Sequence, residues 1–135
     1  MDNNRKTRLR WFVILLDIVV YLLVTLIGFT SHDALLQAPL LRMLATFVPF
    51  TTAWFIAAPW LGLFRFEIIR ERRYLPRVLM AVVLAAPLGA TLRGFWLGSP
   101  ILPAFVLVMA AVSGLAMLLW RALLQFIISR STAAS

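Results

Sequence analysis

Four long apolar runs separated by short charged connections constrain this chain more than any other feature. The runs cover residues 11–29, 43–64, 77–92 and 101–120. A helix needs about 20 mainly apolar residues to cross a bilayer, and none of the runs alternates as a strand does. Each run is apolar on all sides, which is typical of helices that face lipid or one another. The sequence therefore predicts an all-α polytopic membrane protein with four transmembrane helices.

The composition agrees with a membrane environment. Apolar residues make up 63% of the 135 residues and charged residues only 13%, against roughly 45–50% and about 25% in soluble globular proteins. A chain with so few polar side chains cannot cover its own surface in water. The sequence contains no cysteine, which excludes disulfides, thiolate metal sites and a cysteine nucleophile.

The basic residues gather in alternate connections. Eleven of the 13 Lys and Arg residues lie before residue 11, between residues 65 and 77, or after residue 120. The other two, Arg42 and Arg93, lie in the first and third connections. The positive-inside rule then places both termini and the middle connection in the cytoplasm. The net charge of +8 is thus explained by topology and anionic headgroups, and no nucleic-acid partner is expected.

The limits of the membrane domain follow from this pattern. The run from Trp11 is too long for a signal peptide and lacks a small-x-small cleavage site, so it is expected to remain as an anchor. Ser99 and Pro100 are predicted to cap the start of the fourth helix. The expected organisation is a basic cytoplasmic tail at 1–10, a four-helix transmembrane domain at 11–127 and a short cytoplasmic tail at 128–135.

Asp17 interrupts the first apolar run. An aspartate costs about 2.5 to 3.5 kcal/mol at the centre of a membrane span and less toward its ends. Arg121 ends the fourth run at the same cytoplasmic level, and an arginine side chain can reach back along a helix. We expect an Asp17–Arg121 ion pair or a hydrogen bond from Asp17 to a neighbouring span, with a proton or substrate site as the alternative. Trp120 is expected at the interface and Trp54 in the interior or facing lipid.

A second polar group is expected at the outer face. It consists of Ser31, His32 and Asp33 after the first run, with Arg93 after the third. Three adjacent residues do not resemble a catalytic triad, whose members converge from separate segments. The group is therefore interpreted as a polar cluster that ties the first connection to Arg93. No cofactor or metal is expected, although a neutral imidazole such as His32 is also a general ligand for haem, chlorophyll or metal.

Two further patterns concern packing and lipid contact. Small residues recur at intervals of four in the third run and again in the fourth run, and such stripes allow helices to approach closely in lipid. The third and fourth spans are therefore predicted to form the core of the bundle. The packing residues are Ala81, Ala85, Gly89 and Gly114. The middle connection is basic and partly amphipathic, so its arginines are predicted to contact anionic lipid while Ile68 and Ile69 dip into the interface. These arginines are Arg65, Arg70, Arg72 and Arg73.

Several short motifs resemble a known family. They are "IGFTSH" after a span that contains Asp17, then "VPF", "LGATLR" with Gly89 and Arg93, and "LWR" with Trp120 and Arg121. In order and spacing the chain resembles the domain of unknown function 3054 family of small prokaryotic membrane proteins. The resemblance implies four spans in a prokaryotic inner membrane. It implies no activity, because the function of that family is unassigned.

Two functions remain open from the sequence. The first is a non-catalytic accessory or scaffold subunit that associates with other membrane proteins or with itself. The alternative is a small homo-oligomeric, proton-coupled transporter using Asp17, similar in size and in the position of its acid to the small multidrug resistance transporters. An intramembrane enzyme is not expected, because Asp17 and His32 lie about a helix length apart and cannot share a reaction centre.

Overall fold

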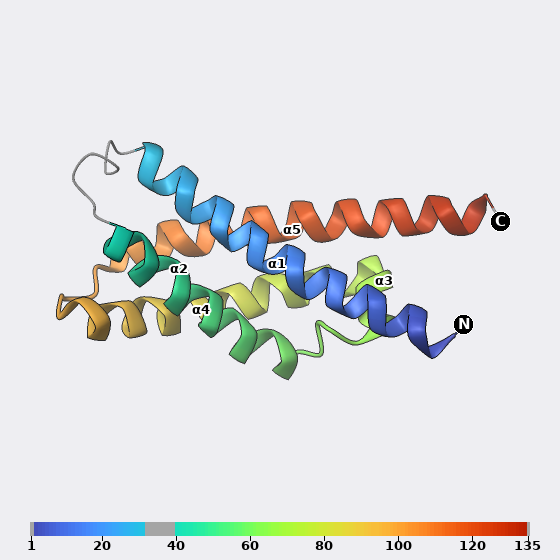
Figure 1. The fold of residues 1–135 in the computed structure, drawn as a ribbon, viewed down its shortest axis with the longest axis horizontal. Helices are drawn as coiled ribbons and strands as arrows, with labels where there is room; N and C mark the ends of the chain where they lie inside the picture. Colours follow the sequence, from blue (N-terminus) through green and yellow to red (C-terminus); the bar gives the residue numbers. More distant parts are fainter. Residues whose placement is uncertain (1, 32–39, 135) are drawn as a thin grey trace.

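Helices account for all the regular structure in the part of the chain that the computed structural model describes, residues 2–31 and 40–134 (Figure 1). The four long helices are α1 (Asn3–Ser31), α2 (Leu40–Trp60), α4 (Leu75–Leu97) and α5 (Pro103–Ala133). Two short ones, α3 (Phe66–Arg70) and η1 (Arg72–Tyr74), lie between α2 and α4. The four long helices are long and apolar enough to cross a membrane. The predicted all-α fold with four transmembrane helices is therefore confirmed.

Both termini lie at the same end of the bundle, toward which α3 also lies (Figure 1). We call this the basic end, because it carries the basic residues of segments 5–10 and 65–77. The start of α2 and the turn between α4 and α5 lie at the other end, which we call the opposite end. An even number of crossings returns the chain to the side on which it began. The charge pattern and the fold therefore agree that both termini and the middle connection lie on the same side.

The helices extend beyond most of the predicted apolar runs. α1 has 29 residues and α5 has 31, which corresponds to about 44 and about 46 Å at ~1.5 Å per residue. Both are longer than the ~30 Å of hydrocarbon that a span must cross. Hydropathy marks the stretch suited to lipid, whereas backbone hydrogen bonding continues through the polar residues at either end. The predicted span 11–29 is therefore the apolar part of a longer helix, and so is the predicted span 101–120 apart from Ile101 and Leu102, which precede α5.

Two glycines end helices by adopting the left-handed backbone conformation. Gly62 (φ 70°) follows α2, which stops at Trp60, four residues before the predicted limit. Gly98 (φ 59°) follows α4, and the Ser99 N–H donates to the Gly94 carbonyl over 3.1 Å. This pattern is a Schellman motif. The predicted cap at Ser99 was wrong, because Ser99 closes α4, and α5 begins at Pro103 after the extended Leu102.

The centre of the bundle is α4, which packs most extensively against α2 and then against α5. A Cβ atom at Gly89 would lie 2.8 Å from Phe50 Cδ1 of α2, whereas one at Gly114 of α5 would contact Leu79 of α4 at 3.4 Å. Ala81 and Ala85 have no exposed surface. The small residues thus serve two interfaces. The prediction that the third and fourth spans form the core omitted α2, because spacing alone does not say which neighbour a stripe faces.

Candidate functional site

Asp17 lies on the inner face of α1. Val13, Asp17 and Tyr21 follow one another at intervals of four, and none of them is more than 1% exposed. Residues four apart lie on the same side of a helix. The rotation of α1 about its axis that buries Val13 and Tyr21 therefore also places the Asp17 carboxylate inside the bundle.

Three side chains donate hydrogen bonds to the Asp17 carboxylate. Trp120 Nε1 donates to Oδ1 over 3.0 Å, and Trp54 Nε1 donates to Oδ2 over 3.0 Å. Arg121 Nη2 also donates to Oδ2, over 2.6 Å, and forms an ion pair with it. The donors come from α2 and α5, so this group, which we call the Asp17 cluster, joins three of the four spans.

Arg121 connects the cluster to the backbone beyond α2. Its side chain is only 3% exposed, and its Nη1 donates to the Leu63 carbonyl over 3.1 Å. The guanidinium also lies over the Phe64 ring, 5.6 Å from the ring centre. A buried charge is tolerated when it is paired and hydrogen-bonded. Arg121 meets both conditions, and it fixes the turn after α2 against α1.

Packing holds the two indole donors in place. The Trp54 ring lies 6.0 Å from that of Tyr21, and the Trp120 ring meets Phe12 edge to face at 6.1 Å. These are ordinary distances for interacting aromatic pairs. The carboxylate thus accepts hydrogen bonds from donors whose positions are set by other contacts. Chemically, the cluster is suited to neutralising and fixing a charge within an apolar interior.

The family model for a protein of unknown function, DUF3054, matches residues 14–124. The chain belongs to the DUF3054 family. The matched region contains all four side chains of the Asp17 cluster and all four membrane spans except the ends of α1 and α5. No curated protein and no solved structure matches this chain.

The connection between α2 and α4 of this DUF3054 protein is held at several backbone carbonyls. Arg10 Nε of α1 donates to the Phe64 carbonyl over 3.2 Å, and Gln125 Nε2 of α5 donates to that of Glu71 over 3.2 Å. Arg77 Nη1 of α4 donates to the Leu61 carbonyl over 3.3 Å. Side chains from three spans therefore fix this connection at the basic end.

The arginines predicted to contact lipid lie along this same connection. Arg70 and Lys6 each lie over the Phe66 ring, at 5.3 and 5.4 Å from its centre. Arg73 forms an ion pair with Glu71, while Arg65 and Arg72 are exposed. Ile68 and Ile69 do not dip into the interface as predicted. They are 8% and 2% exposed, because the fixed connection turns them toward the bundle.

The structure describes only part of the predicted outer cluster. Ser31 ends α1, and His32 and Asp33 lie outside the described residues. Arg93 does not follow the third span but lies within α4, where its Nε donates to Thr46 Oγ1 of α2 over 3.0 Å. Among the described residues, the contacts of Arg93 tie α4 to Thr46 of α2 and to the Phe105 ring of α5.

Sequence reasoning missed the tryptophan donors. Trp120 was expected at the interface, but its N–H points to Asp17, and no partner was predicted for Trp54. One available signal was that a buried indole N–H usually finds an acceptor. Asp17 is the one carboxylate in the described spans, which made it the obvious candidate.

We expect Trp54→Phe to lower the free energy of unfolding by about 0.5 to 1.5 kcal/mol, because the ring is kept while one hydrogen bond to the carboxylate is lost. Unfolding by SDS in mixed micelles measures the difference. Trp60→Phe is the matched control, since Trp60 is 90% exposed, and it should change stability much less. Equal effects of the two substitutions would contradict a role for the Trp54 hydrogen bond.

Proposed function

We propose that this DUF3054 protein is a non-catalytic accessory or scaffold subunit of a prokaryotic inner membrane. The observation that carries the proposal is the state of Asp17. It has no exposed surface, and both of its oxygens already accept hydrogen bonds from Trp54, Trp120 and Arg121. A carboxylate bound in this way by side chains of its own chain serves to hold helices together.

The outward faces of α1 and α5 support association within the membrane. In their most apolar stretches only 28% and 22% of the residues are buried inside the protein, against 44% in the stretch that includes α4. Large apolar side chains such as Leu15, Ile27, Leu107 and Leu115 are more than half exposed. These faces contact lipid or another membrane subunit, while the arginines of the basic end anchor the protein at anionic headgroups.

The proposed orientation places the basic end in the cytoplasm. Because the sequence has no cysteine, single cysteines can report their side of the membrane to an impermeant thiol reagent. We expect Asn4→Cys and Arg72→Cys to react only after the membrane of intact cells is opened, and Phe95→Cys to react from outside, since it lies at the opposite end and is 82% exposed. The reverse labelling pattern would refute this orientation.

The alternative function, a homo-oligomeric proton-coupled transporter, also has one observation in its favour. Asp17 is the single carboxylate in the described membrane spans, and intramembrane carboxylates are common proton carriers in transporters. In that case the bonds to Trp54, Trp120 and Arg121 would have to open in each transport cycle.

Asp17→Asn distinguishes the two functions, because the amide keeps the shape of the side chain but does not exchange a proton. An accessory subunit leaves the native membrane in mild detergent as a particle with fixed companion proteins. Asp17→Asn leaves Arg121 without its ion pair and so lowers the yield of folded protein, but we expect the folded fraction to form a particle of the same mass and composition. Asp2→Asn, at an exposed position, is the control. A particle holding only copies of this chain, together with proton flux into proteoliposomes that Asp17→Asn abolishes, would establish the transporter instead.

A further inference from the structure

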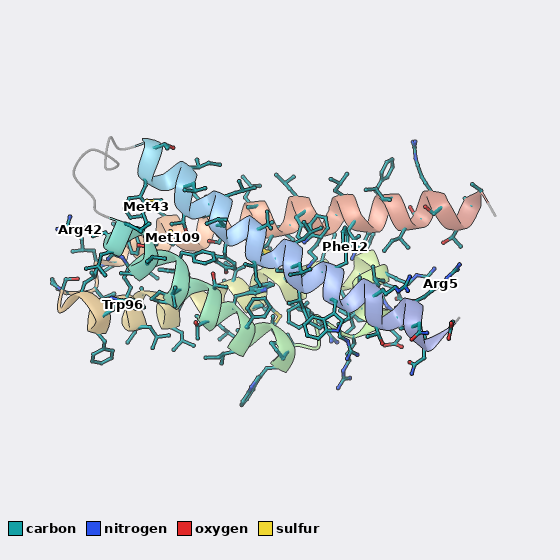
Figure 2. The ribbon with its side chains drawn as sticks, viewed as in Figure 1. Arg5, Phe12, Arg42, Met43, Trp96 and Met109 are labelled. Atoms are coloured by element: carbon teal, nitrogen blue, oxygen red, sulfur yellow. The ribbon has the colours of Figure 1, made fainter. Side chains whose placement is uncertain are left out.

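A cavity of about 230 Å³ lies toward the opposite end of the bundle, remote from the basic end. Side chains of all four long helices line it. Val24, Phe105 and Met109 contribute apolar walls, and Thr46 and Arg93 contribute polar atoms. Figure 2 shows Met109, Arg42 and Met43 toward this end of the bundle and Arg5 at the basic end. The cavity shares no residue with the Asp17 cluster.

Arg93 is held in a defined position at this cavity. Its Nε donates to Thr46 Oγ1 over 3.0 Å, and its guanidinium lies over the Phe105 ring, 4.7 Å from the ring centre. The Thr46 hydroxyl in turn donates to the Arg42 carbonyl over 3.1 Å. Within residues 2–31 and 40–134, no carboxylate forms an ion pair with Arg93. A guanidinium presents five N–H donors, so Arg93 can bind an anion while keeping the bond to Thr46.

A second cation makes an anion at this position favourable. Arg42 lies one turn before Thr46 on α2, close enough for its charge to repel that of Arg93. Arg93 is also partly removed from water, which strengthens the repulsion. An anion beside Arg93 and near Arg42 offsets this repulsion and replaces lost hydration. The apolar walls next to it fit a hydrocarbon chain.

We propose that this cavity binds the anionic head of an amphiphile, a carboxylate or phosphate joined to an apolar chain. The head contacts the Arg93 guanidinium, and the first part of the chain lies against Val24, Phe105 and Met109. The volume corresponds to about eight water-sized groups at ~30 Å³ each, enough for a head and the start of a chain. The remainder of the chain extends into lipid. The head belongs either to a membrane lipid or to a free acid.

Binding of radiolabelled oleate and of methyl oleate to the full-length protein in phosphatidylcholine nanodiscs tests the proposal. We expect saturable binding of oleate and at least tenfold weaker binding of the uncharged ester. Arg93→Gln should weaken oleate binding at least tenfold, as expected for the loss of a hydrogen-bonded charge pair. Arg130→Gln, which removes an exposed arginine near the other end of α5, should leave binding unchanged. Equal binding of acid and ester, or equal affinities of the two variants, would overturn the proposal.

A second variant tests the cavity without altering its charge or its packing. Gly28 lines the cavity, and a Cβ atom there would meet nothing within 4 Å. Gly28→Leu should therefore fold normally, fill part of the cavity and weaken oleate binding at least tenfold; unchanged binding would show that the ligand lies elsewhere.

Nanodiscs that also contain phosphatidylglycerol identify the source of the head. Competition by this lipid would assign a lipid headgroup, and undiminished oleate binding would assign a free acid.

Discussion

Arg121→Met is expected to lower the free energy of unfolding by about 3 to 5 kcal/mol, the typical cost of removing one partner from a buried ion pair. The substitution deprives Asp17 of its 2.6 Å ion pair and the Leu63 carbonyl of its donor. The carboxylate would then keep only its two indole donors in an apolar interior. Reversible unfolding by SDS in mixed micelles, followed by tryptophan fluorescence, measures the change.

Two control variants test whether the effect of Arg121→Met comes from the loss of the buried ion pair. Arg130→Met removes an exposed arginine of the same helix and should change stability by no more than about 0.5 kcal/mol. The double variant Asp17→Leu with Arg121→Met removes both charges, and replacing a whole buried pair by apolar residues is often neutral. We expect it to recover most of the loss. If Arg121→Met alone stayed within about 1 kcal/mol of the unaltered protein, the ion pair would not hold the spans together.

Gly89→Ala should destabilise the bundle by about 1 to 3 kcal/mol, the usual range for overpacking a filled core. The added Cβ atom would lie 2.8 Å from Phe50 Cδ1 and 3.0 Å from Phe50 Cα. The second contact is with backbone, so α2 itself has to move away from α4. The same SDS titration measures the loss, with the near-ultraviolet circular dichroism of the aromatic core as a second readout.

Gly28→Ala is the matched control for this prediction. Gly28 is also a helical glycine, but a Cβ atom there has nothing within 4 Å. Replacing an unhindered helical glycine by alanine generally stabilises a helix by about 0.5 to 1 kcal/mol. A lower free energy of unfolding for Gly89→Ala and a higher one for Gly28→Ala would locate the close approach between α2 and α4. A higher free energy of unfolding for Gly89→Ala would disprove that close approach.

The Asp17–Arg121 geometry could be predicted, but the rest of the cluster could not. Asp17 was the one acid in an apolar run, and Arg121 was a cation at the same depth, so charge and residue counting sufficed to suggest the pair. Whether an indole N–H reaches the Asp17 carboxylate depends on how α2 and α5 are rotated about their axes. Trp54 and Trp120 lie on different helices, and only their packing aims both N–H groups at one carboxylate.

The middle connection shows the same limit. Its basic and apolar residues were interpreted as a lipid-facing segment, and Arg65 and Arg72 are indeed exposed. Ile68 and Ile69 turned inward because Arg10, Arg121 and Gln125 fix carbonyls on either side of them. Hydrogen bonds from distant spans to backbone carbonyls leave no pattern in the local sequence.

The sequence by itself determined that four helices cross a membrane and that the basic connections lie on one side, because hydropathy and charge are local properties of consecutive residues. It also marked Asp17 as a costly residue that needed a partner. Only the tertiary structure decided that α2 shares the core with α4, that two tryptophans complete the Asp17 cluster, and that Arg93 borders a cavity. Each of these depends on how the helices rotate and cross, and that arrangement is set by the packing of all four helices together.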